Sequence, residues 1–170
     1  MAKTRDYLIN QYKIKHEQEV YGNTGVHHHH TVNSFIKEFN IKSVLDYGAG
    51  QSKLIDKLSP KIKDRYDPAI PGIDALPTRD YDLITCTDVM EHLLNEADAA
   101  SVLGELVRKG RYVYLTISCQ IAKKTLPDGT NCHTLVRSPD WWLERIEELG
   151  VDVIYKNKSE NYLELFITSL

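Results

Sequence analysis

Two carboxylates and two glycines in the first half of the chain have the types and spacing to bind a ligand. Residues 46–50, Asp-Tyr-Gly-Ala-Gly, end a short apolar run, and Asp67 lies 21 positions after Asp46. Glycines let a ligand approach the backbone and expose the amide groups of the next helix. A carboxylate about 20 residues beyond such a turn is where a pair of ribose hydroxyls is accepted. The spacing favours a nucleoside site over a simple strand-to-helix turn.

The same glycine turn does not have the features of a phosphate site. The G-x-x-x-x-G-K-[ST] pattern of a phosphate loop is absent, and no third glycine follows Gly50. Asp46 would repel a pyrophosphate because both groups carry negative charge. A carboxylate at this position suits a cationic group, such as the amino group of a sulfonium-bearing amino acid.

Strands and helices alternate along the chain and would position these residues. The spacing of apolar residues and the turn residues predict helices over 5–19, 31–40 (capped by Thr31), 54–58, 95–108 and 138–149. They predict strands over 43–47, 62–66, 82–87, 111–118, 151–155 and 162–168. Such alternation predicts an α/β fold with a mostly parallel sheet covered on both faces. We expect a single-domain Rossmann-like doubly wound sheet over 1–170, with a helical segment at 1–40, a cofactor-binding core at 41–170 and one antiparallel strand near the C-terminus.

At these positions the chain resembles the class I methyltransferases that use S-adenosylmethionine. Residues 44–50 are similar to their first motif, Asp67 to the acidic end of their second strand, and 82–92 to their fourth-strand signature. The closing hairpin is similar to their reversed seventh strand, and the likeness runs from about Tyr21 to the C-terminus. Short bacterial and phage methyltransferase-like proteins also share a Tyr-Gly-x-x-Gly segment and a loop like 128–133.

The resemblance implies S-adenosylmethionine as the cofactor and S-adenosylhomocysteine as its product. It implies that the cofactor is bound by Asp46, Tyr47, Gly48, Ala49, Gly50, Asp67, Pro68, Asp74, Thr87, Asp88 and Val89. Asp74 is the substitute for a carboxylate that relatives place against the adenine amino group. Only 13 residues separate Asp67 from Tyr81, where relatives fit a helix and a third strand. Because a crossover with its helix needs at least about 10–12 residues, we expect a shortened third-strand region.

Methyl transfer from a sulfonium is an in-line displacement, so much of the acceleration comes from positioning the acceptor. A base is needed only where the acceptor must lose a proton, and the catalytic candidates for that role are His133 and His92. Both have a structural alternative, a hydrogen bond for His133 and bracing of a loop for His92. Glu91 with these histidines lacks a recognisable metal-ligand spacing, so no metal site is predicted. The tract His27–His30 is expected to be a polar loop leading into a helix.

Composition and loop content narrow the acceptor. A net charge of −3 without a basic stripe argues against nucleic acid, and no apolar run approaches the roughly 20 residues of a membrane helix. A cytoplasmic protein with three reduced cysteines is expected. We expect the segment 123–142 to build the pocket of a small acceptor, which is anionic if Lys123, Lys124 and Arg137 contact it. One of the two tryptophans is expected in the core and the other in the wall of this pocket. The oligomeric state stays open.

Two other functions remain as alternatives. The first is a non-catalytic module that binds S-adenosylmethionine, supported by the shortened second half of the cofactor site. The second is an enzyme of another class with a nucleoside cofactor, such as a reductase. Asp46 and the single reversed strand argue against that second alternative.

Overall fold

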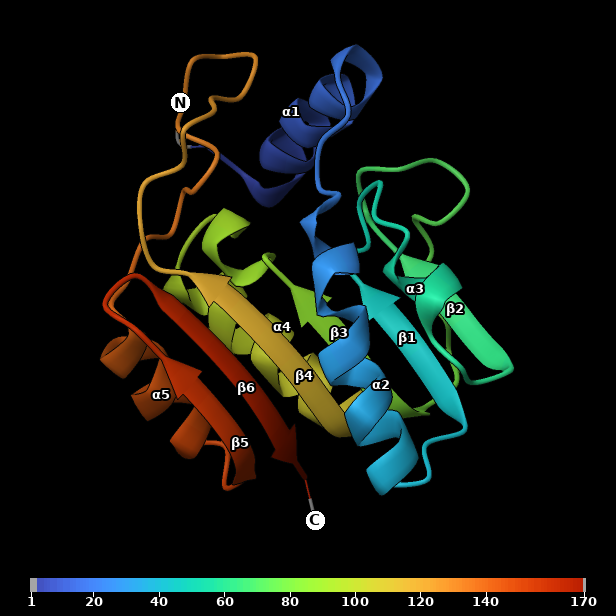
Figure 1. Cartoon of the computed structure of the whole chain (residues 1–170). Coiled ribbons are helices and arrows are strands. Elements are labelled where there is room, and N and C mark those ends of the chain that lie inside the picture. Colours follow the sequence, from blue (N-terminus) through green and yellow to red (C-terminus); the bar gives the residue numbers. More distant parts are fainter. Residues whose placement is uncertain (1–2, 170) are drawn as a thin grey trace.

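A six-stranded sheet forms the centre of the protein in a computed structural model that describes residues 3–169. The strands lie in the order β2-β1-β3-β4-β6-β5 (Figure 1). Their bounds are Ser43–Tyr47 (β1), Ile62–Tyr66 (β2), Tyr81–Thr87 (β3), Gly110–Ser118 (β4), Asp152–Lys158 (β5) and Tyr162–Thr168 (β6). The first four are parallel, and β6 runs antiparallel to both β4 and β5. The predicted mostly parallel sheet with a reversed strand near the C-terminus is confirmed.

Helices cover both faces of this sheet (Figure 1). They are Arg5–Gln18 (α1), His29–Glu38 (α2), Leu54–Lys57 (α3), Glu96–Lys109 (α4) and Pro139–Glu147 (α5), with short 3-10 turns at Thr24–His28 and Met90–His92. Helices α2 and α3 pack on one face, while α4 and α5 pack on the other. Helix α1 lies apart from both layers, across the end of the sheet at which β1 and β4 finish.

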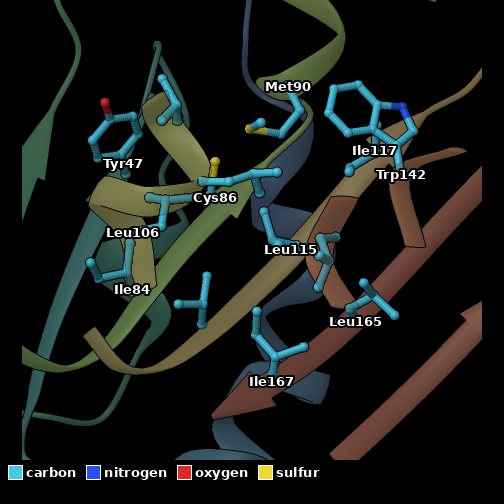
Figure 2. Packing of buried hydrophobic residues seen from close by; sticks show 14 of the residues in the cluster. Tyr47, Ile84, Cys86, Met90, Leu106, Leu115, Ile117, Trp142, Leu165 and Ile167 are labelled. Carbon is cyan, nitrogen blue, oxygen red and sulfur yellow. The ribbon is translucent and has the colours of Figure 1, made fainter. Parts of the chain in front are cut away.

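The two packing layers follow from alternation along the buried strands. In β1, Val44 packs with α2 and α3, whereas Leu45 packs with the α4 and α5 layer, and neither side chain is exposed. Figure 2 shows the second layer, in which Trp142 lies close to Ile117 and above Leu165. Trp142 has no exposed surface. The prediction that one of the two tryptophans belongs to the core is therefore confirmed.

Side-chain caps begin two of the predicted helices. Asn95 accepts a hydrogen bond from the Asp98 amide at the start of α4, and Ser138 accepts one from Trp141 at the start of α5. The predicted cap at Thr31 is wrong. The 3-10 turn that precedes α2 runs directly into it, so α2 begins at His29 and Thr31 lies within its first turn.

The connection between β2 and β3 is short. Residues 67–80 contain neither a helix nor a strand, so β2 is an edge strand. The shortened third-strand region is thus confirmed, and it leaves the carboxyl end of β2 without the helix that a full crossover would provide. Among residues 3–169, no helix combines the length and the apolar character needed to cross a membrane.

Candidate functional site

The site lies where the strand order reverses. The chain passes from β1 to β2 on one side and returns to β3 on the other, so the carboxyl ends of β1 and β3 meet at a switch point, where ligands of open α/β sheets bind. Two clefts open there, a first cleft of about 810 Å³ and a second cleft of about 840 Å³. Residues shared by both clefts are Tyr21, Gly22, Gly48, Asp88 and His92.

The first cleft is mostly apolar with a few carboxylates. Its apolar walls come from α1, from the segment after β3 and from α4; they include Leu8, Ile9, Val89, Leu93 and Val102. Its polar lining includes Asp67 and Asp98, with Pro68 and Ala69 beside Asp67. An apolar slot with few convergent polar groups is the usual form of a small-molecule site.

Glycine is required at position 48 by two independent features. Its φ is +69°, a left-handed conformation, and a Cβ there would lie 2.4 Å from Cγ2 of Val89. However, the amides of Gly48 and Ala49 both donate to the Tyr66 carbonyl at 2.8 and 2.9 Å. These two amides of the turn are therefore not free for a ligand, because the end of β2 already accepts their hydrogen bonds.

Asp67 lines the first cleft and also holds the loop around it. One carboxylate oxygen accepts from the Gly50 amide and the other from the Ala69 amide, each at 2.8 Å. The residue is 8% exposed. Since each carboxylate oxygen has two lone pairs, each retains one for a ligand hydroxyl. The predicted position of the ribose-binding acid is consistent with this geometry.

Asp46 lies below the floor of the clefts and lines neither of them. It is 1% exposed; Oδ1 accepts a hydrogen bond from Thr85 at 2.8 Å, and Oδ2 has no partner. Burial raises the pKa of this carboxyl to about 6, with the Thr85 hydroxyl and Arg65 opposing the shift. The structure therefore does not bring Asp46 into contact with the space that a ligand amino group would occupy.

Asp74 does not line the first cleft, whereas another carboxylate, that of Asp98, does. Asp74 is exposed, accepts a hydrogen bond from the Gly72 amide and lines neither cleft, because the short 67–80 loop folds back on itself. Asp98, in the first turn of α4, lines the first cleft, and its buried Oδ2 has no partner. Sequence reasoning missed Asp98 because the same residue satisfies the ordinary preference for acids in the first turn of a helix.

Asp88 joins the end of β3 to the N-terminal part of the chain. Its φ of +54° is left-handed, and its carboxylate oxygens accept from Thr24 at 2.7 Å and from Thr116 at 2.9 Å. The neighbouring Thr87 lies against Gly25, where a Cβ would lie 2.6 Å from the threonine Oγ1. Strained backbone at such a position is typical of functional sites.

The Tyr-Gly-x-x-Gly segment passes directly over the glycine turn. A Cβ on Gly50 would lie 2.6 Å from the Gly22 carbonyl oxygen. The Gln51 side chain accepts from the Tyr21 amide at 2.9 Å and donates to the His16 carbonyl at 3.0 Å. These contacts place the segment between the two clefts, which sequence reasoning had noted only as a likeness to relatives.

Helix α1 and the loop 119–138 form one cover over the site. The Tyr12 hydroxyl donates to the Cys132 carbonyl at 2.6 Å, and the Lys15 ammonium donates to the Thr125 carbonyl at 2.8 Å. Asp128, at the tip of the loop, accepts from Tyr7 at 2.9 Å. Helix α1 carried little signal of this role, because its periodicity is modest and the side chains it buries include the polar Gln11 and Lys15.

The second cleft is more polar than the first. It is lined by the ends of β1 and β3, the N-terminal segment and the loop after β4, including Thr24, Ser52, Thr87, Glu91, Lys124 and His133. The Lys124 ammonium pairs with Glu19. Of the loop side chains that were expected here, Lys124 and His133 line the cleft, whereas Lys123 and Arg137 do not.

Two other residues of the segment 123–142, Asn131 and Trp141, make contacts outside the clefts. Asn131 accepts from the amides of Ala122 and His133, and so shapes the loop from within. Trp141 packs between Arg137 and Arg145 and lines neither cleft. The expectation that the second tryptophan walls the acceptor pocket therefore does not hold for either of these clefts.

Two histidines and a glutamate converge in the second cleft. His92 Nδ1 lies 2.8 Å from the Cys132 carbonyl oxygen, and His133 Nδ1 is bonded to the Gln120 carbonyl. A carbonyl only accepts, so each Nδ1 carries the hydrogen, and in the neutral ring each Nε2 is a free acceptor. Burial lowers the pKa of His92 to about 4, which keeps the ring neutral at pH 7.

Glu91 completes this group. It has no exposed surface; Oε1 accepts from the Ser118 amide at 3.0 Å, and Oε2 has no partner. Burial, followed by the charge of Asp88, raises the pKa of the Glu91 carboxyl well above its usual range.

The four-residue tract His27–His30 takes no part in the clefts and is divided between a 3-10 turn and the start of α2.

No protein-family model and no curated protein matches this sequence, but solved structures share its fold. The N-methyltransferase NodS from Bradyrhizobium japonicum, in complex with S-adenosyl-L-homocysteine, is 14% identical with a TM-score of 0.65, over 94% of this chain and 98% of that one. The magnesium protoporphyrin IX methyltransferase ChlM from Synechocystis, with bound SAH, is 14% identical with a TM-score of 0.62, over 98% of both chains. A DhpI–SAH complex is 18% identical with a TM-score of 0.63, over 96% of this chain and 98% of that one. The chain has the Rossmann-like fold of S-adenosylmethionine-dependent methyltransferases.

Proposed function

We propose that this protein is an enzyme that transfers a methyl group from S-adenosylmethionine to a small-molecule acceptor. The observation that carries the proposal is the pair of connected clefts at the β1/β3 switch point, with the Asp67 carboxylate in the first cleft. The shared fold with solved methyltransferases supports the same assignment.

The residues of the first cleft fit the nucleoside part of the cofactor. Asp67 keeps free lone pairs for two ribose hydroxyls, and Asp98 Oδ2 is a buried acceptor without a partner, which suits an exocyclic amino group. The apolar walls between these carboxylates suit a flat base. Bound S-adenosylmethionine would supply a methyl group on a sulfonium, already activated for displacement.

The second cleft fits an acceptor. It adjoins the first cleft at Gly48, Asp88 and His92, and the loop after β4 contributes Lys124 and His133 to its lining. The net charge of −3 supports a small acceptor over nucleic acid. The free Nε2 atoms of His92 and His133 would orient the acceptor and receive its proton where one must leave. Lys124 is the cleft residue that would favour an anionic group.

Thermal unfolding tests the cofactor assignment. S-adenosylmethionine and S-adenosylhomocysteine should stabilise the protein, because a ligand at 100 times its Kd adds about 2.7 kcal/mol. For a chain of this size, the melting temperature should rise by roughly 5–10 °C, while NAD should leave it unchanged. A larger shift with NAD, or none with either sulfur nucleoside at millimolar concentration, contradicts the assignment.

Calorimetry with Asp67→Ala tests the site within the fold. The substitution removes charge-assisted hydrogen bonds of about 1.5–3 kcal/mol each, so affinity for S-adenosylhomocysteine should fall at least tenfold. It also frees the Gly50 and Ala69 amides, so the melting temperature should fall while the circular dichroism spectrum keeps its shape. Wild-type affinity in the variant would remove Asp67 from the site.

Product formation separates an enzyme from a binding module with the same fold. Metabolite fractions would be incubated with protein and a labelled methyl donor. Label in a small molecule supports the proposal, whereas label mainly in nucleic acid or protein contradicts a small acceptor. On an accepted substrate, His133→Ala should reduce turnover far more than it reduces cofactor affinity.

A further inference from the structure

We propose that Glu91, His92 and His133 form a binding site for a divalent first-row transition metal ion in the second cleft. A carboxylate oxygen and one ring nitrogen from each histidine lie within 4.8 Å of one another. Two imidazoles and one carboxylate are a ligand set that suits Zn²⁺, Mn²⁺, Fe²⁺ or Co²⁺ better than Mg²⁺ or Ca²⁺.

The orientation of both histidines supports ligation through Nε2. Each ring donates its Nδ1 hydrogen to a backbone carbonyl, that of Cys132 for His92 and that of Gln120 for His133. Such second contacts fix the ring and the tautomer, and they accompany most histidine ligands of metal ions. The two rings meet edge to face with centroids 4.9 Å apart, so the two side chains lie close enough to bind one ion.

The unpartnered glutamate oxygen is the independent observation. Glu91 is fully buried, and its Oε2 has no hydrogen-bond partner. Among residues 3–169, no lysine or arginine forms an ion pair with it, and Lys124, the ammonium of this cleft, is paired with Glu19. A buried oxygen without a partner is a free ligand atom, and a divalent ion bound there would satisfy it.

The ligand atoms of Glu91, His92 and His133 would need to move only slightly to bind one ion. At metal–ligand distances of about 2.1 Å, ligand atoms of a tetrahedral site lie about 3.4 Å apart. Glu91 and His92 are fixed at the end of β3, whereas His133 belongs to the loop 119–138, so the loop would supply the movement. Metal binding would therefore also draw this loop onto the second cleft.

Three protein ligands leave coordination positions open toward the cleft. Resting on the proposed function, an acceptor oxygen would fill one of them, and the site would favour a hydroxyl-bearing acceptor over an amine. In that case the two histidines position the acceptor through the metal, which would lower the pKa of the acceptor hydroxyl so that its proton leaves to water.

The test is calorimetric titration of metal-free protein with Zn²⁺ and with Co²⁺, together with the visible absorption of the Co²⁺ form. We expect one ion per chain in the wild type, and an affinity at least tenfold lower in both His133→Ala and Glu91→Gln. Glutamine keeps the bond from the Ser118 amide, and His133 lies in a loop, so both variants should fold. The control is His27→Ala/His30→Ala in the separate histidine tract, which should bind as the wild type does.

Loss of binding in that control alone would assign the ion to the histidine tract and overturn the proposal. Unchanged affinity in His133→Ala and Glu91→Gln would overturn it as well. Parallel titrations with S-adenosylhomocysteine distinguish this proposal from the proposed function: a chain that binds the nucleoside but neither ion refutes only the metal site, and one that binds an ion but not the nucleoside refutes only the cofactor assignment.

Discussion

The two clefts differ in how the chain builds them. Two carboxylates of the first cleft belong to the sheet and its helices: Asp67 lies at the end of β2, and Asp98 lies in the first turn of α4. The second cleft draws on two loops far apart in the sequence, residues 20–25 and the loop after β4 that carries His133. The ends of β1 and β3 are common to both, together with Tyr21 and Gly22 of the N-terminal segment.

The two clefts therefore place different structural requirements on the chain. The first cleft depends on backbone geometry, because a glycine turn and a short loop must place two carboxylates around an apolar slot. The second cleft depends on side chains that long-range hydrogen bonds hold in place. We therefore expect changes in the shared floor to affect both clefts, and changes in one wall to affect one ligand.

The largest expected effect is that of Gly48→Ala, in the shared floor. A left-handed φ costs an L-residue about 1–2 kcal/mol, and overpacking against Val89 adds about 1–3 kcal/mol. Urea unfolding should show a loss of about 2–5 kcal/mol, and binding of S-adenosylhomocysteine should be lost.

Gly150→Ala is the matched control for that substitution. Its φ is +70°, but a Cβ there meets nothing within 4 Å, so only the conformational part remains. It should cost about 1–2 kcal/mol and leave binding unchanged. Equal losses of stability in the two variants would show that contact with Val89 is not a constraint on the floor.

Asp46→Asn should change stability in a pH-dependent way. The folded pKa is raised to about 6 from an unfolded value near 3.9, so the stabilising difference is present below pH 4 and is lost as the pH rises through 6. The free energy of unfolding of the variant, relative to that of the wild type, should therefore rise by about 3 kcal/mol between pH 4 and pH 8.

Urea unfolding of both proteins across this range measures the difference. A gap that does not vary with pH would mean that Asp46 ionises as an exposed carboxyl does. Affinity for S-adenosylhomocysteine should stay within about threefold of the wild type, because Asp46 lines neither cleft. A larger loss would restore the direct contact with the ligand that the sequence predicted.

The smallest of these effects is that of Asp98→Ala, which is confined to the first cleft. Losing one hydrogen bond to a charged group should weaken S-adenosylhomocysteine binding about tenfold, by roughly 1.5 kcal/mol. Asp74→Ala provides the comparison and should leave affinity unchanged, because Asp74 lines neither cleft. The reverse ranking of the two variants would return the adenine contact to Asp74.

The alternation of apolar runs and turn residues predicted the fold well. The six strands and five helices lie close to the ranges that periodicity and turn residues predicted. The start of α2 was misplaced because a 3-10 turn joins it without a capping side chain, and a tract of histidines has no distinct propensity for either form.

The residues of the candidate site that directly follow the ends of strands could be predicted from the sequence. Gly48, Asp67, Asp88 and His92 meet as the switch-point rule requires. Contacts between distant segments were beyond sequence reasoning: Asp98 resembles an ordinary helix-start acid, and α1 shows no clear apolar stripe. The depth of Asp46 below the floor depends on which strand face it occupies and on the turn above it.

The joining of α1 to the loop 119–138 has a kinetic consequence. Because Tyr7, Tyr12 and Lys15 bond the loop, moving either part of the cover alone would break these hydrogen bonds. We expect ligands in either cleft to escape through one shared opening event, so that their dissociation rates change in parallel with temperature. A site covered in this way would turn over at the pace of that opening and not of the chemical step.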